Sequence, residues 1–193
     1  EFRRVLFRSG EVRALTKLKR EFGRPPWSLG SKPYAIDSVG TIYAAPIAVA
    51  TPQGFGSDVL AMDTRGRKKE WHSLAENQLD NLSCCDAGLV AVASASDAGP
   101  AITCYALGES YGETLIRSSS AQAFDEVSRP QFVTFPAGKG VKVHGIYYAP
   151  VNSAVTPPRG TKPPALVLAH GGPTSMAGRS LAARVQFYTS RGF

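Results

Sequence analysis

Residues 165–175 read Ala-Leu-Val-Leu-Ala-His-Gly-Gly-Pro-Thr-Ser, and this stretch decides the predicted fold of the second half of the chain. The five residues 165–169 form a continuous apolar run, which is typical of a strand buried on both faces of a sheet. The loop His170-Gly-Gly-Pro173 follows, and a helix is predicted over residues 180–191. Strand, glycine-rich loop and helix in this order predict the start of an α/β sheet.

The predicted helix shows one apolar face. Leu181, Val185 and Tyr188 recur at the spacing of a helix face, and Gly192 stands where a glycine closes a helix. The spacing therefore predicts a helix with these three side chains on one face.

Gly171 and Gly172 are the residues with the clearest chemical meaning. Two consecutive glycines let the backbone approach a ligand and aim its N–H groups without a Cβ in the way, as binding of a developing oxyanion requires. The alternative is a tight turn that only needs a positive φ.

Upstream, the sequence predicts a β-rich region. Residues 128–135 and 141–148 alternate apolar and polar side chains around Pro136–Gly140, which indicates an antiparallel hairpin. Between residues 32 and 118, two units of four short strands, each roughly 40 residues long, have the spacing of β-propeller blades, with a β-sandwich as the alternative. Strands are expected at residues 41–50, 58–63, 70–74, 89–94, 101–107 and 113–117.

Two pairs of segments resemble a known family. Residues 163–175, together with Gln186-Phe-Tyr-Thr-Ser-Arg-Gly-Phe193, look like the opening of the catalytic domain in the prolyl oligopeptidase family of serine peptidases, in its dipeptidyl aminopeptidase and acylaminoacyl-peptidase branch. Residues 21–30 and 34–36 resemble the propeller segment of that branch. The resemblance implies a β-propeller that filters access to an α/β-hydrolase domain, and peptide-bond hydrolysis by Ser, Asp and His with no metal or other cofactor.

The resemblance also assigns roles to the loop. His170, Gly171 and Gly172 fall where the family lines its oxyanion hole, and the backbone N–H of Gly172 is the best candidate donor. Some relatives have a Tyr in place of His170 and use its hydroxyl, so no such side-chain donor is implied here. His170 is not the expected catalytic base, because that His comes last in the family's chain order.

The nucleophile is not expected within this chain. A Gly-x-Ser-x-Gly elbow is absent, and Gly178-Arg-Ser-Leu-Ala182 departs from it at the last position. Ser175 and Ser180 are therefore predicted to be loop and helix-cap residues. The triad is expected beyond the C-terminus, so the chain is predicted to be an inactive fragment of a serine-type peptidase.

The expected organisation follows from these motifs. Residues 1–9 are predicted to be a read artefact, since Leu6-Phe-Arg-Ser9 is also what one frame of a common sequencing adapter would encode. Residues 10–126 are predicted to be the last blades of a β-propeller, and residues 127–193 the N-terminal part of an α/β-hydrolase peptidase domain.

Charge and composition narrow the function classes. The net charge is +7, and residues 127–193 hold eight Arg and Lys but no Asp or Glu, so that segment alone cannot supply an acidic base. Its basic residues are spread singly, which argues against nucleic-acid binding. No apolar run approaches 18 residues, so no membrane association is expected. The expected partner, a peptide substrate, is what the family resemblance implies.

The remaining candidates are predicted to be structural. Cys84, Cys85 and Cys104 lack zinc spacing and are expected to be buried reduced thiols, which favours a cytoplasmic location. His72 and His144 are expected to be packed or surface side chains, and residues 65–69 a solvated basic loop. The aromatic residues expected in the strand cores are Trp27, Tyr34 and Tyr43, with a place along the tunnel of a propeller as the alternative.

Two other functions stay open at the level of sequence. A noncatalytic β-rich binding module would use the glycines of the loop only as a turn. An α/β-hydrolase esterase would usually carry His-Gly-Gly-Gly, whereas position 173 is Pro. Oligomeric state and P1 specificity are not determined by the sequence.

Overall fold

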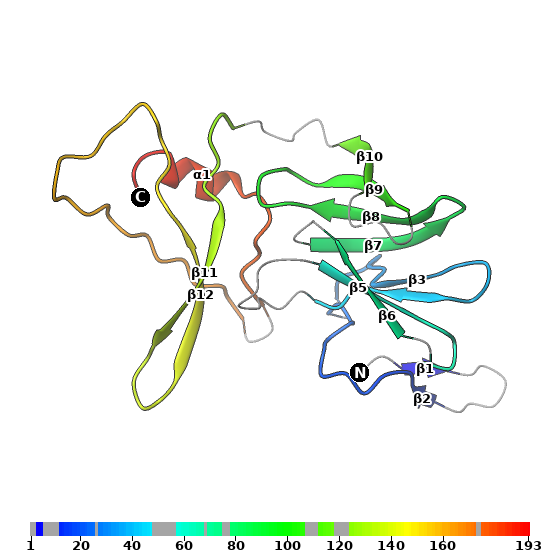
Figure 1. Ribbon diagram of the computed structural model, residues 1–193. Helices are drawn as coiled ribbons and strands as arrows, with labels where there is room; N and C mark the ends of the chain where they lie inside the picture. The colour runs from blue at the N-terminus through cyan, green and yellow to red at the C-terminus, as the bar shows by residue number, and fades with distance from the viewer. Residues whose placement is uncertain are drawn as a thin grey trace.

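The computed structural model describes residues 3–5, 12–25, 27–47, 57–67, 69–74, 78–106, 112–117, 124–172 and 175–193. Their regular structure consists of antiparallel strands and one short helix (Figure 1). The elements are β1 Arg3–Val5, β2 Val12–Ala14, β3 Tyr34–Ile36, β4 Ile42–Ala44, β5 Ser57–Met62, β6 Lys69–Leu74, β7 Gln78–Cys85, β8 Gly88–Ser94, β9 Ala101–Tyr105, β10 Glu113–Arg117, β11 Pro130–Pro136, β12 Lys142–Tyr148 and α1 Ala183–Thr189.

Two four-stranded sheets form the larger part of the fold. Their strand orders, β3-β4-β5-β6 and β10-β9-β8-β7, are simple antiparallel meanders in which each strand pairs with its neighbour in sequence. The predicted pair of four-strand units is therefore confirmed. The expected strand at residues 41–50 is shorter than predicted: β4 ends at Ala44, and residues 48–50 lie outside the described part.

Two turns of the first sheet, β3–β4 and β5–β6, share the sequence pattern Asp-x-x-Gly. In the β3–β4 turn, Asp37 accepts hydrogen bonds from the backbone N–H groups of Val39 (3.1 Å) and Thr41 (2.7 Å). In the β5–β6 turn, Asp63 accepts from the N–H of Arg67 at 2.8 Å. An aspartate that binds backbone amides two and four residues ahead fixes the turn, which explains why these strands pair where they do.

The main core lies between the two sheets. Tyr105 and Leu82, exposed by only 2% and 1%, belong to the same buried cluster as Tyr43 and Val59 of the first sheet. Burial of each side chain of this size stabilises the fold by about 1.5–3 kcal/mol. Tyr43 thus confirms the expectation of a core aromatic, whereas Trp27 (71% exposed) and Tyr34 (45%) lie at the surface.

The first sheet is buried on its second face as well. Ile42, Leu60 and Met62 pack there with Leu15 and Phe22 of the preceding segment. On the second sheet, by contrast, Ile102 remains 37% exposed on the face opposite the core. Each sheet therefore buries the face that meets the other, as stacked sheets do.

The predicted thiols lie in strands, but they are not fully buried. Cys84 and Cys104 are partly buried and Cys85 is exposed. Alternation along β7 explains the difference, because Leu79 and Leu82 take the core positions around a bulge at residues 80–83. The prediction of buried cysteines is wrong for Cys85.

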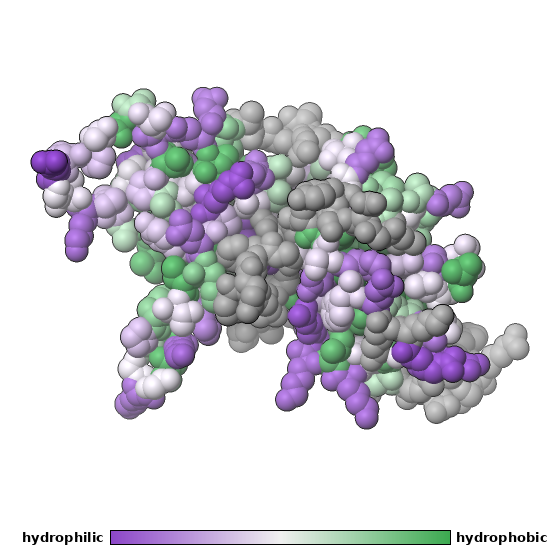
Figure 2. Space-filling view, viewed as in Figure 1, coloured by the Kyte–Doolittle hydropathy of each residue, from purple (hydrophilic) through white to green (hydrophobic). Residues whose placement is uncertain are grey.

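The predicted hairpin over residues 128–148 is confirmed. β11 and β12 pair in register from Pro130 with Tyr148 to Pro136 with Lys142. The hairpin extends away from the two larger sheets, and α1 lies near its base (Figure 1). Figure 2 shows apolar side chains at the surface of this part, mixed with charged ones.

The predicted strand at residues 165–169 is not formed. Leu166, Val167 and Leu168 belong to no strand or bridge, and their exposed fractions are 45%, 87% and 50%. A strand buried on both faces requires neighbours on both edges and a covering layer on each face. The described residues supply neither, so the start of an α/β sheet is not seen.

The helix is shorter than predicted, and its buried face differs. α1 begins after Ala182, so Ser180 is not its cap, and the prediction of a helix-cap serine is wrong. Gln186 and Thr189 are its buried residues, in place of the predicted stripe of Leu181, Val185 and Tyr188. Gly192 has φ 87°, which confirms the predicted glycine at the helix end.

Candidate functional site

The loop His170-Gly171-Gly172 lies at the surface. All three residues are exposed, and a Cβ built at Gly171 or Gly172 would meet no atom within 4 Å. Gly172 has φ 66°, in the left-handed region that an L-residue enters at a cost of about 1–2 kcal/mol. Backbone conformation is therefore the reason for glycine at 172, since the structure shows no crowding there.

The amides of this loop are available to a ligand. The structure records no hydrogen bond from the N–H of Gly171 or Gly172 to any described residue. The ring of His170 turns back on the loop, with Nδ1 3.4 Å from the carbonyl oxygen of Gly171. Exposed backbone N–H donors without a protein acceptor can bind a negatively charged oxygen.

No nucleophile accompanies these donors among the described residues. Ser175 is exposed in the loop, as predicted, and neither it nor Ser180 hydrogen-bonds to a histidine. His144 contacts Thr134 at 2.9 Å and stacks on Phe132 with ring centroids 5.5 Å apart. His144 is thus a surface side chain of the hairpin, as expected.

Two of the three cysteines, Cys84 and Cys104, are poor candidates for an alternative nucleophile. Burial raises the pKa of the Cys84 thiol, and the nearby Asp37 and Cys85 raise it further. Burial also raises the pKa of Cys104, with added effects from Cys85 and Glu113. Since the thiolate is the reactive form, both side chains are protonated and poorly nucleophilic at neutral pH.

Two further features concern metal ligands and membrane-spanning helices in the described ranges. Within them, no three His, Cys, Asp or Glu side chains come together as metal ligands. The helix α1 has only seven residues, and the described part of the chain contains no helix long and apolar enough to cross a bilayer.

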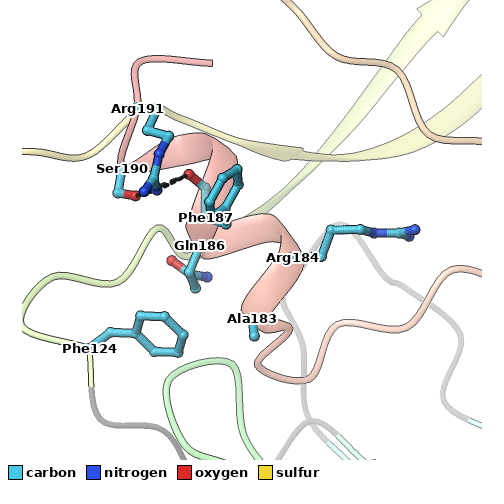
Figure 3. A pocket seen from close by; sticks show the side chains of 7 residues that line it. All are labelled: Phe124, Ala183, Arg184, Gln186, Phe187, Ser190 and Arg191. Carbon is cyan, nitrogen blue, oxygen red and sulfur yellow. Dashed lines mark hydrogen bonds between the residues drawn. The ribbon is translucent and has the colours of Figure 1, made fainter.

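A hollow of about 550 Å³ beside α1 was not foreseen from the sequence (Figure 3). Arg191 closes one side of it, with its guanidinium 3.8 Å from the ring centroid of Phe187 and donating to the Phe187 carbonyl at 3.0 Å. Ser190 also donates to that carbonyl, and Arg184 extends away from the other lining side chains. Its described lining residues include no serine–histidine or other nucleophile–base pair, so the hollow offers no catalytic group of that kind.

A buried polar pair that the sequence did not reveal holds α1 in place. Gln186 is 2% exposed and Ser128, just before β11, is 4% exposed. The Gln186 side chain accepts from the Ser128 N–H at 2.8 Å and donates to the Ser128 carbonyl at 3.1 Å. The helix that follows the candidate loop is thereby fixed to the base of the hairpin. In the sequence, Gln186 and Thr189 are three residues apart, a spacing that places both on one face of a helix.

Two contacts with the segment that follows β8 also hold the chain near α1 and near the start of β11. The N–H of Leu181 donates to the carbonyl of Ala95 at 2.8 Å, and Arg129 forms an ion pair with Asp97 at 2.6 Å. Because both partners of the ion pair are more than a third exposed, its contribution is about 1 kcal/mol or less.

Comparison with known proteins identifies the fold. A crystal structure of puromycin hydrolase matches 99% of this chain with a TM-score of 0.80 at 23% identity, and a serine-to-alanine mutant of that protein complexed with PGG gives the same values. A puromycin-hydrolyzing peptidase of Mycobacterium tuberculosis matches 96% of the chain with a TM-score of 0.76, also at 23% identity.

The chain spans only 28% of the length of each of these structures. No protein-family model matches the sequence, and no curated protein does. At this identity the comparison establishes a shared fold.

Proposed function

We propose that this chain is part of a longer serine peptidase of the prolyl oligopeptidase family, of the dipeptidyl- or acylaminoacyl-peptidase type, which hydrolyses peptide bonds of short peptides. The observation that carries the proposal is the match of 99% of the chain, at a TM-score of 0.80, to about a quarter of puromycin hydrolase. The sequence of residues 163–175 supports the proposal as well, through its resemblance to the opening of the family's catalytic domain.

In the proposed enzyme the two four-stranded sheets are blades that restrict access to the active site. The N–H of Gly172 donates to the oxygen that becomes negative when the peptide carbonyl is attacked. The nucleophilic serine, the aspartate and the histidine of the triad belong to the rest of the longer protein. The reaction needs no metal or other cofactor, and the proposed location is the cytoplasm.

In the proposed enzyme, Ser175 and Ser180 take no part in catalysis. Ser175 and Ser180 have no base beside them among the described residues, and a serine hydroxyl without a base is a poor nucleophile. The 193-residue chain alone is therefore expected to be inactive.

The test compares the 193-residue chain with the complete product of its gene. Both are treated with a fluorescent fluorophosphonate, which labels activated serines, and then assayed with aminoacyl p-nitroanilides and with p-nitrophenyl esters. We expect labelling and amide hydrolysis by the complete product only. Labelling of neither protein would favour the binding module, and hydrolysis of esters without amides would favour the esterase.

A further inference from the structure

The second sheet brings together two cysteines that are far apart in the sequence. Cys85 ends β7 and Cys104 lies in β9, and β8 runs between these strands. In β9 the core side is taken by Thr103 and Tyr105, so Cys104 lies on the opposite face. In β7 it is Cys84 that packs against the core, while Cys85 is exposed. The side chains of Cys85 and Cys104 therefore share the outer face of the sheet.

Gly88 keeps the space between these two cysteines open. It is the partner of Cys85 in β8, whereas Cys104 pairs with Val90, the next outward-facing residue of that strand. Gly88 has φ 139°, and a Cβ at this position would collide with the carbonyl oxygen of Tyr105. Only glycine suits both conditions, and it leaves no side chain beside Cys85 on β8. The thiol of Cys104 donates a hydrogen bond to the sulfur of Cys85.

The intervening strand decides what can link the two sulfurs. Two strand spacings amount to about 9–10 Å, whereas a disulfide requires Cα atoms about 4.4–6.8 Å apart. A disulfide between Cys85 and Cys104 would therefore require β7 or β9 to move. A cation between two thiolates adds a second bond of about 2.3 Å and so spans a wider gap than a single S–S bond of about 2 Å.

The chemistry of the pair selects the cation. Zinc in a structural site takes four ligands, and among the described residues no third His, Cys, Asp or Glu joins the two thiols. Thiolates prefer soft cations, of which Cu(I) is the one that accepts only two ligands. Glu113, the partner of Cys104 on β10, adds a negative charge close to the pair, and this charge also favours a cation.

We propose that Cys85 and Cys104 form a binding site for Cu(I), held between their two sulfurs on the outer face of the second sheet. On binding, the two S–H bonds break, two Cu–S bonds form and two protons are released to water. Copper stays in the +1 state, so no oxidant or reductant is needed. The cation links β7 to β9 and stabilises the sheet. The site is separate from the loop at residues 170–172 and does not depend on the peptidase assignment.

The test measures Cu(I) binding to the reduced 193-residue chain without oxygen, by competition with the chromophoric chelator bicinchoninate. We expect one Cu(I) per chain, two sulfur neighbours in the X-ray absorption spectrum of the copper, and a raised thermal midpoint. Cys85→Ser and Cys104→Ser should each weaken binding about a hundredfold or more, since even residues that only support a metal ligand contribute about 10–100-fold. Cys84→Ser removes the adjacent thiol on the core side and is the matched control, with unchanged affinity.

Several results would overturn the proposal. They are absence of Cu(I) binding, binding that survives Cys104→Ser, an equal loss with Cys84→Ser, or one Cu(I) shared by two chains, seen as a copper-dependent doubling of mass in light scattering. Ready formation of a Cys85–Cys104 disulfide by the folded chain with glutathione disulfide, detected by mass spectrometry, would contradict the argument from strand spacing. Thermal unfolding shows whether each variant is folded, and Cys85→Ser, at an exposed position, keeps the test decisive if Cys104→Ser is not.

Discussion

At the scale of single residues, the account depends on Gly172, whose φ of 66° turns the chain directly after the His-Gly pair. Gly171 lies beside it in equally open space but is not among the residues with positive φ. Gly171 is therefore a matched control for Gly172, because only Gly172 has a backbone conformation that favours glycine.

Gly172→Ala in the complete gene product should lower kcat/KM about tenfold. The left-handed conformation costs an L-residue about 1–2 kcal/mol, so alanine shifts the backbone that carries the proposed donor. Gly171→Ala should stay within twofold of the wild type. Steady-state kinetics with an aminoacyl p-nitroanilide provides the measurement, and equal rates for both variants would contradict the proposed role of Gly172.

Gln186→Ala should reduce the free energy of unfolding of the chain by about 2–3 kcal/mol. The substitution leaves the buried N–H and carbonyl of Ser128 without their partner, and each unsatisfied group costs about 1–3 kcal/mol. Urea unfolding followed by circular dichroism measures the change. Gln131→Ala, at an exposed position of β11, is the control and should have an effect within about 0.5 kcal/mol. Similar losses for both variants would show that the buried pair does not hold α1.

At the scale of elements, local sequence signals predicted hairpins well and failed for the segment that needs distant partners. The hairpin around Pro136–Gly140 and the strands at residues 57–62 and 88–94 follow from alternation and turn residues close to one another in sequence. The apolar run at 165–169 was predicted from composition alone, and a buried strand requires neighbours that the described residues do not provide.

The candidate site was predictable only in part. The His-Gly-Gly motif located the open loop, because glycine pairs have a direct conformational meaning. Ser128 and Gln186 carried no such signal, since their mutual contact joins segments far apart in the chain. Burial of a polar side chain is a tertiary property that a single sequence does not reveal.

The turn between β3 and β4 is expected to lose stability in acid, because it depends on the ionised carboxylate of Asp37. Burial tends to raise the pKa of Asp37, but hydrogen bonds from Thr41, Val39 and Gly40 outweigh it and lower the pKa below the usual 3.8. A lowered carboxyl pKa stabilises the fold above about pH 4, and this stabilisation is lost as the pH falls through the folded-state value.

Asp37→Asn should therefore make the thermal midpoint less dependent on pH between about 5 and 2, because asparagine does not titrate. Melting curves over that range provide the measurement. Asp86→Asn, in the exposed turn between β7 and β8, should retain the wild-type slope. A slope unchanged by Asp37→Asn would show that the turn does not contribute to acid sensitivity.

At the scale of the whole molecule, two sheets share a well-buried core, while the segment from β12 to α1 is largely exposed. Residues 157–172 are exposed throughout, including the apolar run with Val167 at 87%. An apolar, extended and unpaired segment is a site for association between chains.

The isolated 193-residue chain should consequently self-associate at micromolar concentrations, and Val167→Lys should reduce this association. A charge on an exposed extended segment opposes edge-to-edge pairing. Light scattering after size-exclusion chromatography measures the mass as a function of concentration. Lys162→Ala, in the exposed loop before the run, is the control. A wild-type chain that stays monomeric would contradict the interpretation of this segment.

The central claim is that the amides at residues 171–172 bind the oxygen that becomes negative during peptide hydrolysis. The most direct test is a crystal structure of the complete gene product with a phosphonate bound covalently to its reactive serine. The account predicts the phosphonyl oxygen about 2.7–3.1 Å from the backbone nitrogen of Gly172. A phosphonyl oxygen held by other donors, with the Gly172 amide facing protein, would contradict it.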